Sequence, residues 1–159
     1  MRSSLLPYHR FDWHERVRAV ENEYKSVWIA VDRLKAAVAH DQTVQKNDPT
    51  PANLSVADRN LEGTYLVRLF AEFESALRSY DRARHNDPTL KTDASNLIIT
   101  IGGRCGQGIS ANVRRGARAA RRVRNYWAHE RDATPEPMSI AQARARLQAF
   151  LAWLPEEWD

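Results

Sequence analysis

Residues 12–41 read DWHERVRAVENEYKSVWIAVDRLKAAVAHD, and this stretch decides the fold of the chain. Its apolar side chains recur alternately four and three residues apart, which places them along one side of an α-helix and excludes a strand. They are Trp13, Val17, Val20, Tyr24, Val27, Val31, Leu34 and Val38. The spacing predicts one long helix from about Asp12 to Asp41. Its apolar seam serves the core of one chain, a coiled-coil contact between two copies, or both.

A second apolar pattern of the same kind follows a loop rich in proline, asparagine and aspartate at residues 45–53. We expect a helix from Ser55 or Asp58 to Arg84, antiparallel to the first and with a wide apolar face. That face consists of Leu61, Tyr65, Leu66, Leu69, Phe70, Phe73, Leu77 and Tyr80. Residues 1–11 and 44–54 lack such a pattern, and we expect a flexible tail and a flexible loop there.

Shorter helices are expected after residue 89. The β-branched run in Leu90–Ile101 fits a short helix or a buried strand, and we expect the helix. An arginine-rich helix begins near Ser110 as its N-cap, and a last helix runs from Ser139 to about Pro155. The chain has no hairpin pattern and no alternation of strands with helices. The sequence therefore predicts one all-α domain over residues 1–159, a bundle of four to five helices.

The composition is that of a globular protein, with 43% hydrophobic residues, 28% charged residues and a formal net charge of +4. No stretch is apolar for long enough to span a bilayer or to act as a signal peptide, so we expect no membrane association and a cytoplasmic location. The single cysteine, Cys105, excludes an internal disulfide and a zinc site built from several cysteines. The five histidines do not recur at ligand spacings, so we expect neither a metal nor a cofactor.

Four of the six glycines lie in the segment GGRCGQG at residues 102–108. Glycines let backbone amides crowd around an anion at a helix N-terminus, but no Gly-Lys-Ser/Thr follows and the neighbouring elements are predicted helices. We interpret the segment as a connection between two helices. Cys105 has an arginine beside it and no histidine nearby, and we interpret it as a passive loop residue.

The positive charge is concentrated late in the chain, where seven arginines and one acidic residue lie between Arg114 and Arg131. On a helix, Val113, Gly116, Ala117, Ala120, Val123 and Trp127 fall on one side. The opposite side carries Arg114, Arg115, Arg118, Arg121 and Arg122, with Asn125 and His129 beyond them. We call these five arginines the arginine face. Its mutual repulsion is costly without an anionic partner, so the pattern predicts binding of a nucleic acid or another phosphate ligand.

The arginine-rich helix ends in Arg124-Asn125-Tyr-Trp-Ala-His129, which resembles the R-x4-6-H motif of the HEPN superfamily. The segment LVRLFAEFE at residues 66–74 is similar to the early helix of several HEPN families that bears phenylalanine and glutamate. This resemblance implies a helical bundle with the motif late in the chain. It also implies a metal-independent endoribonuclease, often the toxin of a toxin–antitoxin or phage-defence pair, and a homodimer whose two motifs line one cleft.

The resemblance assigns roles to particular residues. His129 accepts the proton of an RNA 2′-hydroxyl or protonates the leaving 5′-oxygen, and Arg124 stabilises the charge on the phosphorane. Asn125 orients the phosphate or the imidazole, while Glu74 either supports the site or has a surface or capping role. Contacts with the RNA backbone are expected from Arg114, Arg118, Arg121 and Arg122. Some HEPN toxins carry a modified tyrosine two residues after the histidine; this chain has Arg131 there.

Two other functions stay open at this point. The first is a nucleic-acid-binding module without catalysis, in which His129 is structural. The second is a protein-interaction module that uses the apolar seam for assembly. On a straight helix Arg124 and His129 are displaced by about 140°, so they converge only if the helix bends or ends near His129, or if a second copy contributes.

Overall fold

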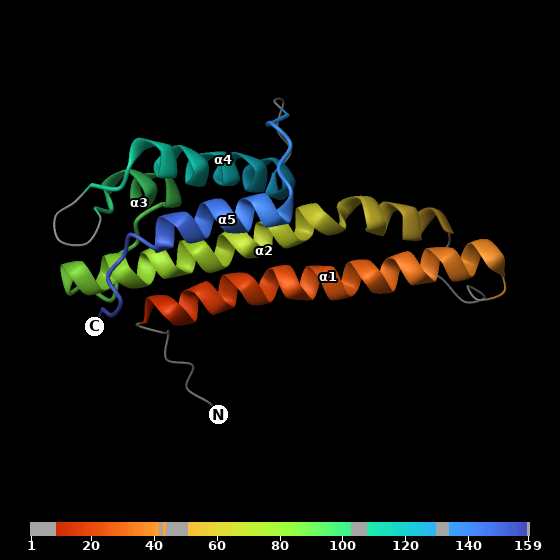
Figure 1. The fold of residues 1–159 in the computed structure, drawn as a ribbon. Helices are drawn as coiled ribbons and strands as arrows, with labels where there is room; N and C mark the ends of the chain where they lie inside the picture. Colours follow the sequence, from red (N-terminus) through yellow and green to blue (C-terminus); the bar gives the residue numbers. More distant parts are fainter. Residues whose placement is uncertain (1–8, 42, 44–50, 103–107, 130–133, 159) are drawn as a thin grey trace.

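The computed structural model describes residues 9–41, 43, 51–102, 108–129 and 134–158, and five α-helices run through them (Figure 1). The helices are α1 (Arg10–His40), α2 (Pro51–His85), α3 (Ala94–Thr100), α4 (Ala111–Ala128) and α5 (Ile140–Leu151). Within the described ranges there is no strand, only one isolated bridge between His9 and Glu157. The predicted all-α helical bundle is confirmed.

The two long helices, α1 and α2, form an antiparallel pair to which the shorter helices add at one end (Figure 1). At 31 and 35 residues they are about 46 and 52 Å long. The backbone N–H of Ile140, the first residue of α5, donates to Glu62 of α2 at 2.9 Å, so α5 begins level with Glu62. The parts of α1 and α2 beyond this level, residues 28–40 and 51–61, extend as a two-helix arm.

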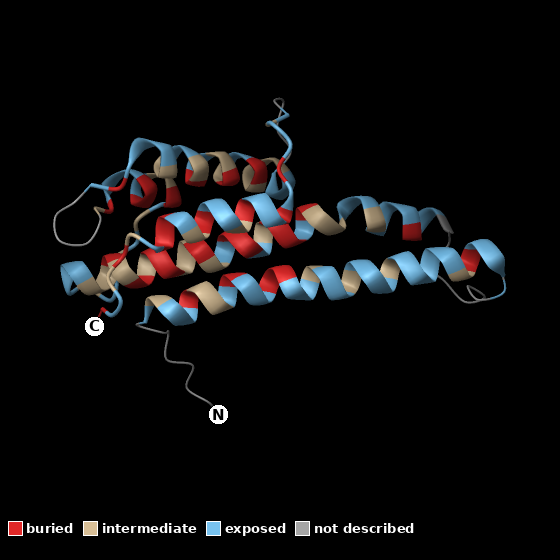
Figure 2. Cartoon of the chain, in the orientation of Figure 1, coloured by how far each residue is buried: buried red, intermediate tan, exposed pale blue. Residues whose placement is uncertain are grey.

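The core lies where the shorter helices cover the long pair. Helix α5 packs on both α1 and α2, α4 packs on α2 and α5, and α3 packs on α2 and α4. Figure 2 shows the buried residues concentrated there, whereas the arm is mostly exposed. The Phe73 and Phe150 rings meet edge to face at 5.5 Å between centroids, and Trp13 is fully buried. This end of the molecule therefore supplies the rigid frame on which α4 is held.

The apolar seam of α1 is used within the chain. Trp13, Val17, Val20 and Val38 are buried, and Tyr24 and Val27 pack against the core from partly exposed positions. Leu34 lies further along the seam and is 37% exposed. The intramolecular use of the seam is confirmed, and a contact between copies stays a prediction.

Two helices begin earlier than the sequence predicted. Helix α1 begins at Arg10, whose backbone N–H donates to the carbonyl of Glu156 at 2.8 Å and whose Nη1 donates to the carbonyl of Leu154 at 2.7 Å. Helix α2 begins at Pro51, because the first helical position needs no N–H and proline has a suitable φ there. Leu54 is a buried residue of α2, so the expected flexible loop does not include 51–54; residues 1–8 and 44–50 lie outside the described ranges.

Helices α3, α4 and α5 each begin at a residue whose side chain caps the N-terminus, within the segments where the sequence predicted helices. Asp93 caps α3 by accepting from the backbone N–H groups of Ser95 and Asn96, which confirms a helix in place of the alternative strand. Ser110 is the N-cap of α4, and Ser139 forms a capping box with Gln142 at the start of α5.

Candidate active site

Helix α4 is the element that carries the candidate site. Its buried residues are Ala117, Ala120 and Val123, so its apolar side is made of small side chains that let the helix lie close to its neighbours. On the same side, the ring of Trp127 covers Gly63 of α2, where an added Cβ would lie 2.1 Å from the ring. Trp127 is nonetheless 40% exposed. The predicted division of α4 into an apolar side and an arginine face is confirmed.

Arg124 lies at the edge of the apolar side and points to α2. Its Nη2 is 3.0 Å from Oε2 of Glu74, and its Nη1 donates to Oδ1 of Asn125 at 2.9 Å. The guanidinium carbon also lies 5.2 Å from the centroid of the Phe70 ring. Glu74, Arg124 and Asn125, which we call the Arg124 site, are therefore brought together by the packing of α4 on α2.

Glu74 joins two arginines, not one. Its Oε1 accepts from Nη2 of Arg78 at 2.6 Å, while its Oε2 faces Arg124. The side chain of Glu74 is 16% exposed and that of Arg124 is 24% exposed, so their interaction is partly shielded from water. Two guanidinium groups around one carboxylate leave a net charge of +1 at this point. The Arg124 site can therefore attract an anion while Arg124 is held in place.

His129 is the residue at which α4 ends. It is the C-cap, with extended backbone angles of φ −143° and ψ 138°, and its backbone N–H donates to the carbonyl of Asn125 at 3.0 Å. Because the chain leaves the helix here, the 140° displacement of a straight helix no longer sets the direction of the His129 side chain. The side chain is exposed and has no hydrogen bond or ion pair with any described residue, Arg124 included.

The arginine face divides into two parts. Arg118 and Arg122 are exposed and Arg121 is half-buried, and these three form no ion pair within the described part of the chain. Arg114 instead donates to the carbonyls of Ile99 and Ile101 at 2.8 Å each, and to that of Ile98. Burial, and to a smaller extent the nearby Arg118, lower the pKa of Arg114.

Arg114 thereby supplies hydrogen-bond donors to the C-terminal end of α3, where the last carbonyls lack partners within the helix. Its guanidinium is therefore engaged by the carbonyls of Ile98, Ile99 and Ile101, and we leave Arg114 out of the surface proposed below to contact RNA. Arg118, Arg121, Arg122, Arg124 and Asn125 lie on α4 as their spacing predicted, whereas His129 caps the end of α4 in an extended conformation.

The sequence did not predict every residue that contacts the site. Arg78 could have been found, because it follows Glu74 by four residues on a helix. The contact of Phe70 with Arg124 and that of Trp127 with Gly63 depend on how α4 crosses α2, which no local pattern indicates. The segment 103–107, with Cys105, lies outside the described residues, as does Arg131.

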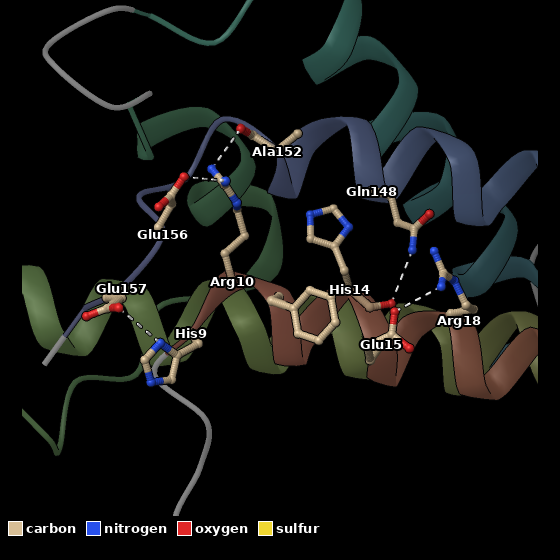
Figure 3. Close-up of a pocket in the computed structure, with 10 residues that line it drawn as sticks. His9, Arg10, His14, Glu15, Arg18, Gln148, Ala152, Glu156 and Glu157 are labelled. Carbon is tan, nitrogen blue, oxygen red and sulfur yellow. Dashed lines mark hydrogen bonds and ion pairs between the residues drawn. The ribbon is translucent and has the colours of Figure 1, made fainter.

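A cavity of about 600 Å³ lies at the start of α1, away from the arginines of α4 (Figure 3). Arg10 reaches from α1 to the carbonyl of Ala152 and to Glu156, and Arg18 pairs with Glu15 at 3.1 Å. Burial lowers the pKa of His14, and Arg10 and Arg18 lower it further. Arg10 and Arg18 thus have partners within the fold, whereas Arg118, Arg121 and Arg122 of α4 form no ion pair with a described residue.

Two further properties of the described residues bear on the sequence predictions. None of the helices in the described ranges is long and apolar enough to cross a bilayer. Among the same residues, no three histidine, cysteine, aspartate or glutamate side chains are grouped as metal ligands would be.

No protein-family model, no curated protein and no solved structure matches this chain.

Proposed function

We propose that this chain is an endoribonuclease that cleaves RNA by attack of a 2′-hydroxyl on the adjacent phosphodiester, without a metal ion. The observation that carries the proposal is Arg124, held by Glu74 and bonded to Asn125 at the end of the arginine face, with an exposed histidine at the next turn. The resemblance of this segment to the HEPN motif supports the same function.

The proposed chemistry needs one proton acceptor, one proton donor and one cation. His129 accepts the proton of the 2′-hydroxyl, the 2′-oxygen forms a bond to phosphorus, and the bond from phosphorus to the 5′-oxygen breaks. The leaving 5′-oxygen takes a proton from a protonated imidazole, which a second copy supplies when two motifs line one cleft. The products are a 2′,3′-cyclic phosphate and a 5′-hydroxyl.

Arg124 is suited to the phosphorane because its position is fixed before RNA binds. Glu74 engages one terminal nitrogen and Asn125 the other, so the guanidinium loses little conformational freedom when a phosphate arrives. The net +1 charge of the two arginines and Glu74 favours the extra negative charge of the transition state. Arg118, Arg121 and Arg122, which lack described acidic partners, contact the RNA backbone in this proposal.

The biological setting belongs to the same proposal. A homodimer would bring two copies of the Arg124 site to one RNA, and a cytoplasmic ribonuclease of this kind would act as the toxin of a toxin–antitoxin or phage-defence pair. An antitoxin protein would then be a second partner.

The experiment compares cleavage and binding in the same variants. Arg124→Ala and His129→Ala are each expected to abolish cleavage of single-stranded RNA and to leave its binding within about threefold of the wild-type value. His40→Ala, an exposed histidine at the far end of α1, is the matched control and should cleave normally. If all variants and the wild type bind RNA but none cleaves it, the chain is a binding module and the catalytic proposal fails.

A further inference from the structure

Helices α4 and α5 form a basic groove that shares Arg115 and Arg122 with the arginine face. A groove of about 400 Å³ lies between them. It is lined by Asn112, Arg115, Gly116, Ala119, Arg122, Glu136 and Arg146. We call it the α4–α5 groove. Arg146 comes from α5, and nothing in the spacing of the α4 arginines indicated that it would join them.

The backbone explains why three arginines meet there. A Cβ added to Gly116 would lie 3.4 Å from Cβ and Cγ of Arg146, so the stem of Arg146 crosses α4 where α4 has no side chain. Arg115 and Arg122 are two turns apart on α4, about 10 Å along its axis, and line the same groove. Gly116 thus lets an α5 arginine join two α4 arginines.

The charges of the groove are not balanced. Arg115, Arg122 and Arg146 have no ion pair with any described residue, and Glu136 is the one acidic residue among those that line the groove. Among the described residues, the guanidinium of Arg115 makes one hydrogen bond, to Oδ1 of Asn112 at 3.3 Å. The described residues of the groove therefore carry a net charge of +2, and most of their guanidinium donors have no described partner. Elsewhere, Arg68 and Arg78 each face a carboxylate at 2.6 Å.

We propose that the α4–α5 groove is a phosphate-binding subsite for the RNA strand that the Arg124 site cleaves. Arg115 and Arg146 hold one phosphate group by charge-assisted hydrogen bonds, and Arg122 continues the path along α4. Arg122 and His129 are seven residues apart on α4, about 10 Å along the axis, so the strand runs from the groove to the end of α4. This inference rests on the proposed function, because it takes the anion to belong to an RNA.

The test is a binding measurement with RNA that cannot be cleaved. A single-stranded 2′-O-methyl RNA lacks the attacking hydroxyl, so its affinity can be measured by fluorescence anisotropy at several salt concentrations. The double variant Arg115→Gln/Arg146→Gln removes two charges from the groove at exposed positions. The matched control, Arg33→Gln/Arg59→Gln, removes two exposed charges from the two-helix arm. Thermal unfolding of each variant confirms that it is folded.

We expect the groove variant to bind about tenfold more weakly, with a slope of log K against log salt that is shallower by about 0.7, because the variant loses the contact with one phosphate. The control variant should keep the wild-type slope. Equal affinity for oligonucleotides with and without a 5′-phosphate identifies the ligand as an internal phosphodiester. A preference for the 5′-phosphate that disappears in the groove variant identifies a terminal phosphate.

The subsite is refuted if the groove variant keeps the wild-type affinity and slope, or if the control variant loses as much as the groove variant. These outcomes are separate from failure of the proposed function. A wild-type protein that binds 2′-O-methyl RNA through the groove but leaves natural RNA intact would retain the subsite and lose the catalytic proposal.

Discussion

Oε2 of Glu74, on α2, lies 3.0 Å from Nη2 of Arg124, near the C-terminal end of α4. This contact joins residues 50 positions apart and fixes the guanidinium beside the Phe70 ring. It makes Glu74 a positioning residue, because it acts on the proposed reaction through Arg124 and not through the RNA. The position of Arg124 therefore depends on the interface between two helices.

The variant Glu74→Gln tests this dependence. It removes the charge that holds Arg124 and preserves the size of the side chain, so we expect kcat for RNA cleavage to fall by about 10- to 100-fold with little change in KM. The free energy of unfolding should fall by about 1–2 kcal/mol, because the ion pair is partly shielded. Steady-state cleavage and urea unfolding measure the two effects.

The control for Glu74 is Glu72→Gln, on the same helix. Glu72 lies 3.7 Å from Arg16 and is 33% exposed, so its loss should change neither quantity noticeably. Equal cleavage by the wild type and Glu74→Gln would contradict the positioning role.

Because Trp127 packs on Gly63, the effect of Gly63→Ala on folding stability should change sign when Trp127 is removed. In the wild-type background Gly63→Ala places a Cβ against the Trp127 ring and should destabilise the fold by about 1–3 kcal/mol. In a Trp127→Ala background the obstacle is gone, and the better helix former alanine should stabilise the fold by up to about 1 kcal/mol. A double-mutant cycle of unfolding free energies measures this, and additive effects would refute the contact.

Substitution of the adjacent residues Arg114 and Arg115 of α4 should affect folding stability to different extents. Arg114→Gln removes donors from carbonyls at the end of α3 and should lower the free energy of unfolding by about 2 kcal/mol. Arg115→Gln, at an exposed position, should change it by less than about 0.5 kcal/mol. Thermal unfolding of the two single variants separates them, and equal stability would show that Arg114 has no structural role.

His14, which lines the cavity at the start of α1, should make the folding stability depend on pH. Burial lowers the pKa of His14 below its ordinary 6.5, and Arg10 and Arg18 add to this, outweighing Glu15. The unfolded chain then binds a proton at a pH where folded His14 does not, so His14 reduces stability as the pH falls below about 6.5. This penalty is absent above that pH and complete below the pKa of the folded state.

His14→Gln should therefore gain stability relative to the wild type at pH 5 but not at pH 7.5. Urea unfolding at the two pH values measures the difference, which cancels contributions from the other titrating groups. A constant difference between variant and wild type would contradict the lowered pKa.

Helices and their caps could be predicted from the sequence because they depend on local spacing. The seam of Trp13 and Val17, the Ser110 cap and the apolar side of α4 follow from periodicity and from the chemistry of single side chains. The early start of α2 at Pro51 was missed, because proline was interpreted as a loop residue although it also suits the first turn of a helix.

The arrangement of the candidate site could be predicted only in part. Arg124, Asn125 and His129 were predicted as site residues from the motif that their segment resembles, and Glu74 from its place in a similar segment. The engagement of Arg114 by carbonyls of α3, and the approach of Arg146 to Gly116, depend on how distant helices pack. Local spacing carries no information about such crossings, so it indicated neither the bonding of Arg114 to α3 nor the place of Arg146 beside the α4 arginines.

The chemical nature of the RNA ends distinguishes metal-independent cleavage by His129 from every other way of cutting RNA. Purified protein is incubated with single-stranded RNA in excess EDTA, and the termini of the fragments are identified by mass spectrometry. We expect 2′,3′-cyclic phosphate and 5′-hydroxyl ends from the wild type and none from His129→Ala. Intact RNA, cleavage that EDTA abolishes, or 5′-phosphate and 3′-hydroxyl ends would contradict this expectation.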